Sequence, residues 1–256
     1  MGGYVAAIAL RAAGDMSPFP RPASFFCHYL GVAGFDQIDL QVMTLRGGRN
    51  AMSQRVTVSQ ADRSILEATI WSTAVSDSLE HEEYSAPEVP RPDDLPAREE
   101  ISDAKTFAFW DNVEMKPVRF GGQWPPPGPL PPVWQAWCRF RPTAAFAEDP
   151  WLDACRSVIL VDVQSWPANS QHHAWKSEHG FIAPSLDLYV AFHRCVPEEQ
   201  WLLADGYAPV SREGMLGWTG RIWTIGGSLV ASGAGQALYR RVTVPDSPRP
   251  QGEVHG

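Results

Sequence analysis

An internal repeat sets the architecture of this 256-residue chain, because one helix followed by a run of strands occurs twice along it. Ser64-Ile65-Leu66 corresponds to Ser228-Leu229-Val230, and Arg49-Asn50-Ala51-Met52 corresponds to Arg212-Glu213-Gly214-Met215. Corresponding segments lie about 163 residues apart, which indicates a duplicated structural unit. The repeat predicts an α+β fold in which each of two helices packs on an antiparallel sheet.

The first copy opens on a helix predicted over residues 3–13, which is apolar on nearly every side, and Gly14 is its predicted end. Alternating polar and apolar residues predict four antiparallel strands after it, over residues 24–31, 37–46, 52–60 and 65–73. A helix without a polar face has to be enclosed by other elements, so we expect these strands to wrap it.

The second copy has two additional strands before its helix, predicted over residues 107–118 and 133–141. Asp149 is the predicted N-cap of that helix and Pro150 its first residue. Four strands follow, over residues 185–194, 201–210, 216–224 and 229–240. The first copy has no counterpart of the two additional strands, so either the true start lies upstream or this is a shortened form whose first sheet has an uncovered edge.

Shifts in composition divide the chain into four parts. We predict an incomplete N-terminal unit over residues 1–78 and a C-terminal unit over residues 105–244. Residues 79–104 are rich in Glu, Asp and Pro and are predicted to be a semi-extended, solvated linker. Residues 245–256 are predicted to be a disordered tail rich in Pro and Gly.

Bulk properties indicate a cytoplasmic globular protein. The net charge of -8 and the pI near 5.3 argue against nucleic acid or an anionic membrane as a partner. The apolar start of the chain lacks the basic segment of a signal peptide, and no apolar run reaches the roughly 18 residues of a membrane span. The four cysteines lack the paired spacing of a zinc or redox site, which predicts free thiols in a reducing compartment.

Asp162 is the first candidate catalytic residue. The second helix carries an apolar stripe made by Trp151, Leu152, Cys155, Val158 and Ile159. Asp162 continues this stripe at the carboxyl end of the helix. Burial and the helix dipole are both expected to raise the pKa of its carboxyl, which suits a general base. The alternative is a carboxylate exposed at a frayed helix end.

Two further polar residues could join Asp162. Ser185 begins a strand after Pro184 and could orient a water, although such a hydroxyl often only bonds the nearby backbone. Gln236 lies in the last strand of the second copy and could offer an amide, unless it faces solvent. An acid, a hydroxyl and an amide from three neighbouring elements could together hold one water.

Several segments, in their order and spacing, are similar to those of the acyl-CoA thioesterase II (TesB-like) family of the double hotdog thioesterase superfamily. They are Gly2-Gly3-Tyr4, the run from Thr44 to Arg49 with Arg55-Val56, Leu160-Val161-Asp162, the run from Ser185 to Arg194, the run from Glu199 to Leu203, and Leu229-Val230-Ala231-Ser232. Together they span most of the chain outside the linker and tail. The resemblance implies a double hotdog whose first copy lacks its N-terminal strands.

The resemblance also implies an activity, the hydrolysis of acyl-CoA to free fatty acid and CoA by a water that an Asp, a Ser or Thr, and a Gln hold. By position, the Asp is Asp162 and the hydroxyl is Ser185, whereas the Gln falls on Gly235, one residue before Gln236. A shift of one residue turns a strand side chain to the opposite face, so Gln236 would need a bulge to reach the site.

Candidate substrate contacts lie at the start of the first helix and at Arg194. Gly2, Gly3 and Tyr4 would offer helix N–H groups to the thioester oxygen as it becomes negative, the alternative being close packing of helix against sheet. Arg194 could bind a CoA phosphate. The chemistry implies no metal or redox cofactor, with CoA entering as part of the substrate. A homodimer or higher homo-oligomer stays open.

Two other functions stay open as well. A hydratase or dehydratase on the same fold would require an Asp and His pair, whereas the residues after Asp162 are Val-Gln-Ser-Trp-Pro. A non-catalytic acyl-CoA or lipid-binding hotdog protein would have lost the third polar group. Release of free thiol from acyl-CoA distinguishes the enzyme from the binding protein.

Overall fold

The computed structural model describes residues 1–75, 79–101, 108–119, 127–142, 146, 149–173 and 181–241. The first repeat consists of helix α1 (Gly2–Asp15) and strands β1 (Arg21–Tyr29), β2 (Asp39–Gly47), β3 (Ala51–Gln60) and β4 (Arg63–Thr73). The segment that connects the two repeats, predicted as a linker over residues 79–104, contains the short helices η1 (Pro92–Asp94) and α2 (Arg98–Ile101). It is called the connecting segment below. The predicted tail over residues 245–256 lies outside the described residues.

The second repeat is longer. It comprises η2 (Ala108–Asn112), β5 (Val113–Pro117), β6 (Val133–Phe140), α3 (Pro150–Asp162), α4 (Ser165–His173), β7 (Phe181–Ile182), β8 (Asp187–Phe192), β9 (Leu202–Arg212), β10 (Met215–Trp223), β11 (Leu229–Leu238) and β12 (Arg240–Arg241). Helix α3 starts as predicted, because the Asp149 carboxylate accepts the backbone N–H groups of Trp151 and Leu152, each at 3.0 Å.

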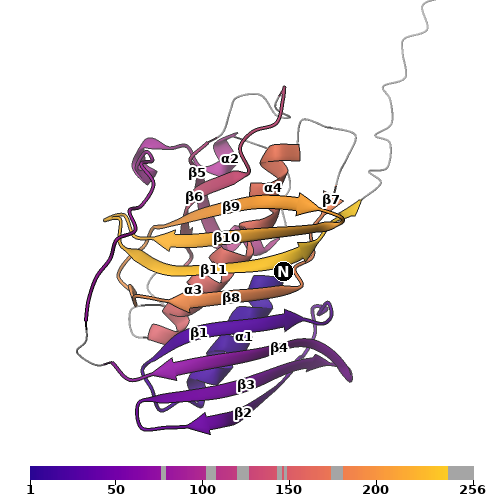
Figure 1. Ribbon diagram of the computed structural model, residues 1–256, viewed down its shortest axis with the longest axis vertical. Coiled ribbons are helices and arrows are strands. Elements are labelled where there is room, and N and C mark those ends of the chain that lie inside the picture. The colour runs from indigo at the N-terminus through magenta and orange to yellow at the C-terminus, as the bar shows by residue number, and fades with distance from the viewer. Residues whose placement is uncertain are drawn as a thin grey trace, which may run out of the picture.

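Ten of the strands form one antiparallel sheet in the order β2-β3-β4-β1-β8-β11-β10-β9-β6-β5 (Figure 1). Each repeat contributes the same four-strand order, β2-β3-β4-β1 from the first and β9-β10-β11-β8 from the second. Strands β1 and β8 pair at the centre, from Ser24 opposite Ala191 to His28 opposite Asp187. This topology confirms the predicted double hotdog.

The additional strands β6 and β5 extend only the second repeat, beyond β9. At the other end of the sheet β2 is the edge strand, and nearly all of its residues are exposed. Among the described residues, no strand pairs with this edge of the first repeat. Strand β5 starts six residues later than the sequence predicts, at Val113, because residues 108–112 form a turn of 3-10 helix. The Asn112 side-chain amide donates to the Phe109 carbonyl (3.2 Å), and this local bond favours the turn.

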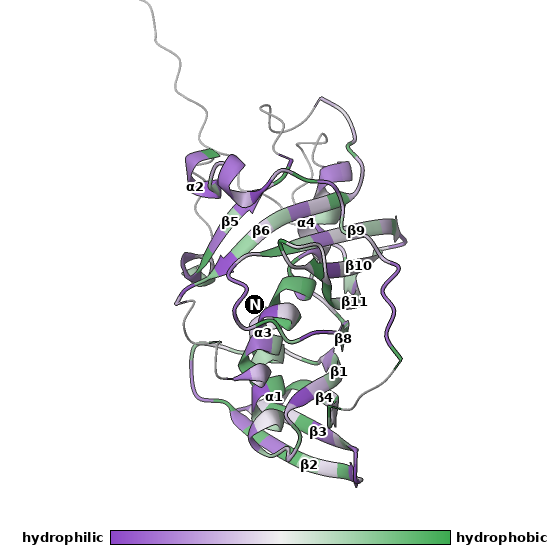
Figure 2. Cartoon of the chain, turned by 90° about the vertical axis from the view of Figure 1, so that its left-hand side faces the viewer, coloured by the Kyte–Doolittle hydropathy of each residue, from purple (hydrophilic) through white to green (hydrophobic). Residues whose placement is uncertain are grey.

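Helices α1 and α3 pack against each other along one face of the sheet (Figure 2). They run in opposite directions, since Gly3 of α1 lies against Asp162 of α3, and Gly14 of α1 lies against Trp151. Gly14 does not end α1 as predicted, because the helix continues to Asp15. A Cβ at Gly14 would lie 2.6 Å from the Trp151 ring, so the glycine serves close helix packing instead. Within the described residues, none of the helices combines the length and apolarity needed to cross a bilayer.

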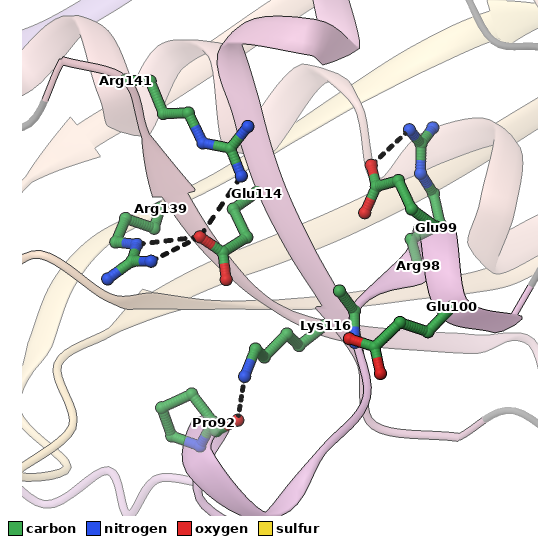
Figure 3. Close-up of polar contacts among 9 residues, drawn as sticks. Pro92, Arg98, Glu99, Glu100, Glu114, Lys116, Arg139 and Arg141 are labelled. Atoms are coloured by element: carbon green, nitrogen blue, oxygen red, sulfur yellow. Dashed lines mark hydrogen bonds and ion pairs between the residues drawn. The ribbon is translucent and has the colours of Figure 1, made fainter.

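Most residues of the connecting segment are exposed, which agrees with the solvated linker predicted from its composition, but part of the segment is anchored to the second repeat. Part of it packs on a second apolar cluster, formed by Trp137, Trp201, Leu203, Trp223 and Leu229. The Trp137 indole donates to the Pro90 carbonyl (2.9 Å), and the Lys116 ammonium donates to the Pro92 carbonyl (2.8 Å; Figure 3). The segment is therefore solvated along most of its length and is anchored to the second repeat at a few apolar residues and backbone carbonyls.

Candidate active site

Asp162 lies where the end of α3 meets the start of α1. Asp162 is buried, with 6% of its surface exposed. The Gly3 N–H donates to Asp162 Oδ2 at 2.7 Å. The two helices can approach this closely because Gly3 has no side chain, and a Cβ there would lie 2.9 Å from the Asp162 Cβ and 3.1 Å from the Ile159 Cα. The start of one helix thus holds the carboxylate that terminates the other.

Two hydroxyl groups converge on the other carboxylate oxygen. Ser185 Oγ donates to Asp162 Oδ1 at 3.0 Å, and Tyr29 Oη donates to the same atom at 3.3 Å. Ser185 precedes β8 and Tyr29 ends β1, the two central strands of the sheet. The Tyr29 N–H also donates to the Leu186 carbonyl (2.9 Å), which joins the two strand ends beside the site. The structure therefore brings Asp162 and Ser185 together, as predicted.

The sequence did not single out Tyr29. The alternation along β1 could have indicated it, because Phe25, Cys27 and Tyr29 lie on the same face of the strand and the first two are fully buried. A tyrosine that ends such an inward-facing row carries its hydroxyl to the inner face of the sheet. Which polar group it would meet there depended on the placement of the second repeat.

Burial raises the pKa of the Asp162 carboxyl above the usual aspartate value. The hydrogen bonds from Gly3, Ser185 and Tyr29 act in the opposite direction, because they stabilise the ionised form, but burial outweighs them. Burial, followed by the nearby Asp162 charge, raises the pKa of Tyr29 well above the usual tyrosine value. At neutral pH the tyrosine hydroxyl therefore keeps its proton and donates.

Gln236 is not part of this cluster. Strands β10 and β11 keep a continuous register from Met215 opposite Leu238 to Ile222 opposite Ala231, so no bulge turns Gln236 inward. Gln236 is exposed, whereas the next residue, Ala237, is fully buried. The structure therefore places the Gln236 side chain on the face of the sheet away from Asp162. The expectation that Gln236 is the third polar group beside Asp162 and Ser185 is wrong.

Gly235 faces the helices, at the position where the resemblance expects the Gln. A Cβ on Gly235 would lie 2.4 Å from the Trp218 ring and 2.6 Å from the Asp187 carbonyl oxygen. Trp218 is 2% exposed, and its indole donates to the Val161 carbonyl at 3.1 Å. The ring of Trp218 thus takes up the space that a side chain at residue 235 would need.

The candidate substrate contacts are only partly arranged as expected. The Gly3 N–H is engaged by Asp162, so in this structure it orients the carboxylate and is not free for an oxyanion. Gly2 packs against Tyr29, because a Cβ on Gly2 would lie 3.1 Å from the tyrosine ring. Tyr4 is 52% exposed, and its ring lies 6.1 Å from that of Phe109.

Arg194, the candidate for a CoA phosphate, is paired with an acidic residue of the connecting segment. Its guanidinium lies 2.5 Å from the Glu82 carboxylate, and Glu82 also accepts the Leu229 N–H at 2.7 Å. The Arg194 side chain remains half exposed. The arginine therefore helps to anchor the connecting segment, and binding a phosphate would require it to exchange or share this partner.

Gly3→Ala is expected to destabilise the protein. The added methyl group would overlap Asp162 and the backbone at Ile159, and such overpacking costs about 1–3 kcal/mol. This exceeds the gain of up to about 1 kcal/mol that alanine has over glycine in a helix. Urea denaturation measures the change, with Gly47→Ala as control because a Cβ at Gly47 would contact nothing within 4 Å. Equal stability of Gly3→Ala and the control would contradict the close helix contact.

Two family models match the chain. The family model of the acyl-CoA thioesterase N-terminal domain matches residues 1–73, and that of the acyl-CoA thioesterase C-terminal domain matches residues 88–239.

Solved structures similar to the chain share its architecture along most of their length. The acyl-CoA thioesterase II TesB2 of Mycobacterium marinum is 25% identical with a TM-score of 0.76, and the match covers 94% of this chain and 90% of that one. A tesB protein of Mycobacterium avium subsp. paratuberculosis is 22% identical, with a TM-score of 0.77 and coverage of 94% and 87%. A conserved protein with a hotdog fold from Alicyclobacillus acidocaldarius is 19% identical, with a TM-score of 0.75 and coverage of 94% and 87%. The chain belongs to the acyl-CoA thioesterase family, a family of thioester hydrolases.

Proposed function

We propose that this protein hydrolyses acyl-CoA to a free fatty acid and CoA with a water molecule activated by Asp162. The observation that carries the proposal is the Asp162 carboxylate, which is buried and yet held by one backbone N–H and two hydroxyls. Burying a carboxylate is costly, and its raised pKa brings it toward the range useful to a general base. A residue needed only for packing would not require this arrangement.

The proposed reaction needs only the groups of this cluster and water. Ionised Asp162 accepts a proton as the water oxygen attacks the thioester carbonyl carbon, which gives a tetrahedral oxyanion. The carbon–sulfur bond then breaks, the carbonyl re-forms, and the proton on Asp162 passes to the departing CoA thiolate. The products are a carboxylic acid and CoA, and Asp162 is ionised again for the next turnover.

The two oxygens of Asp162 would have different tasks. Oδ2 is held by the Gly3 N–H, which fixes the plane of the carboxylate. Oδ1 receives the Ser185 hydroxyl, so a water on Oδ1 would lie within reach of a second polar group that can hold it. A water fixed at two points presents its lone pair in one direction, which is what attack on a carbonyl requires.

The oxyanion would be stabilised at the start of α1. The first N–H groups of a helix have no partners within the helix and lie at the positive end of its dipole. The Gly3 N–H is used by Asp162, so the neighbouring N–H groups of Gly2 and Tyr4 are the candidates in the proposal. They lie on the same helical turn as the group that holds the general base.

The activity is expected to be lost as the pH falls through the pKa of Asp162, because only the ionised carboxylate can accept a proton. Burial raises this pKa, so the acid limb of kcat/KM should lie above the value of about 3.9 for an exposed aspartate. A profile of kcat/KM between acid and neutral pH locates the limb. A limb at or below the exposed-aspartate value would contradict a buried base.

A non-catalytic acyl-CoA-binding protein is the second candidate, and one observation favours it. The position at Gly235 has no polar side chain, and Trp218 fills the space. A DTNB assay over short, medium and long acyl-CoA, run beside equilibrium binding of the same esters, separates the two candidates. Release of free thiol supports the hydrolase, whereas binding without release supports the binding protein and refutes the proposed reaction.

A further inference from the structure

We infer that Tyr29 is the third polar group of the site and that its hydroxyl, supplied by the first repeat, positions the Asp162 carboxylate and its water. This inference rests on the proposed function. It assigns to β1 a task that the resemblance expects from β11 of the second repeat. The site would then be shared by both repeats, with Tyr29 from the first and Asp162 and Ser185 from the second.

The position of the Tyr29 hydroxyl supports this role. It reaches the same oxygen, Asp162 Oδ1, that Ser185 reaches, at 3.3 Å and 3.0 Å respectively. The opposite oxygen is held by Gly3. Any water that approaches Oδ1 therefore has a serine hydroxyl and a tyrosine hydroxyl as its immediate polar neighbours. A hydroxyl can both donate and accept, so it can bond the water and the carboxylate in turn.

The surroundings of Tyr29 hold its ring in place. Gly2 leaves room for the ring, since a Cβ there would lie 3.1 Å from Tyr29 Cε1 and 3.2 Å from Cζ. On the backbone side, the Tyr29 N–H donates to Leu186, the residue after Ser185. The two hydroxyls therefore come from strand ends that are hydrogen-bonded to each other, which fixes their separation.

Neither residue 235 nor residue 236 can supply the third polar group of the site. Gly235 offers no side chain, and the Trp218 ring and the Asp187 carbonyl exclude one. Gln236 faces away from the helices. Among the described residues, the groups that bond the Asp162 carboxylate are Gly3, Ser185 and Tyr29, so the tyrosine is the group left to complete the set.

The test is Tyr29→Phe, which deletes one oxygen and keeps the ring. We expect kcat for acyl-CoA hydrolysis to fall by about 10- to 100-fold, with KM nearly unchanged, since the lost contact acts on the water and carboxylate. The acid limb of the pH profile should move to higher pH, because the deleted bond stabilises ionised Asp162. A merely structural role would not move that limb.

Two further variants calibrate the result. Ser185→Ala should shift the limb in the same direction, because Ser185 donates to the same oxygen. Tyr189→Phe, an identical change at a 45% exposed tyrosine of β8, should leave kcat and the limb as in the wild type. Thermal melts of all variants confirm that they are folded at the assay temperature.

The outcomes separate the inference from the function on which it rests. Wild-type protein that releases no CoA would overturn the proposed function and the inference together. An active wild type with a Tyr29→Phe variant of unchanged kcat and unchanged acid limb would overturn the inference alone. Lower kcat with a shifted limb in Tyr29→Phe, and not in Tyr189→Phe, supports it.

Discussion

Asp162→Asn is expected to lower kcat for acyl-CoA by at least about 1000-fold, because the variant keeps the shape of the side chain but removes the proton acceptor. The asparagine can still accept the Gly3 N–H through its oxygen, and its NH2 group can donate to the Ser185 or Tyr29 hydroxyl. The site should therefore keep its geometry, and binding of a CoA ester should persist. Initial rates of thiol release and calorimetric binding measure the two properties separately.

Asp205→Asn is the matched control for this substitution. Asp205 is also a hydrogen-bonded carboxylate, which accepts from the Gln135 amide at 2.8 Å and the Trp223 indole at 3.4 Å. It lies on β9 beside the second apolar cluster, to which Trp223 belongs. Its variant should retain wild-type kcat. Unchanged turnover in Asp162→Asn would refute the assignment of the base, whatever the control shows.

Asp162→Asn is also expected to change the stability of the protein. The pKa of Asp162 is higher in the folded state than in the unfolded chain, so ionisation of this carboxyl destabilises the fold above the folded pKa. Asp162→Asn removes that ionisation and should therefore stabilise the protein at neutral pH. The gain should vanish as the pH falls below the unfolded value of about 3.9. Urea denaturation at two pH values measures it.

The largest loss of stability is expected from Asp153→Ala. Asp153 and Arg156 of α3 form a buried ion pair, with side chains 4% and 2% exposed. Arg156 also donates to the carbonyls of Val196 (2.9 Å) and Glu199 (2.6 Å), and Asp153 accepts the Val196 N–H (2.8 Å). The pair thus ties α3 to the loop between β8 and β9.

Removing Asp153 alone would leave the Arg156 charge buried without its partner, which costs about 3–5 kcal/mol. The change is measured as the shift of the urea midpoint at constant m-value. Glu213→Ala is the control, because Glu213 pairs with Arg212 on the surface, where the two side chains are 81% and 80% exposed, and should leave the midpoint unchanged. A midpoint for Asp153→Ala equal to that of the control would show that the pair is not needed.

The fold could be predicted because its signals are local and occur twice. Alternation with a period of two marks each strand, and the repeat shows that two similar units share the chain. Asp162 could be predicted for a related reason, since its place on the apolar stripe of one helix depends only on helical periodicity. Gly14 misled the prediction of the end of α1, because glycine is favoured both after a helix and where two helices touch.

The rest of the site depends on contacts between the repeats. Tyr29 and Gly3 lie 133 and 159 residues from Asp162 in the sequence, and their contact with it follows from the pairing of β1 with β8 and the packing of α1 on α3. The direction of the Gln236 side chain could not be predicted either. A bulge would have turned it to the opposite face, and only the pairing register with β10 shows that there is none. The anchoring of the connecting segment to the second repeat was not predicted either, because its charged residues outnumber the few apolar ones that pack.

Asp162 could in principle attack the thioester itself, so the water pathway has its own test, a single turnover in water labelled with oxygen-18. Enzyme in excess over acyl-CoA is quenched after one cycle, and the fatty acid and the peptide containing Asp162 are analysed by mass spectrometry. The proposed mechanism predicts one labelled oxygen in the fatty acid and none in the Asp162 carboxyl. Label in Asp162 together with unlabelled fatty acid would show attack by the carboxylate and contradict the activated water.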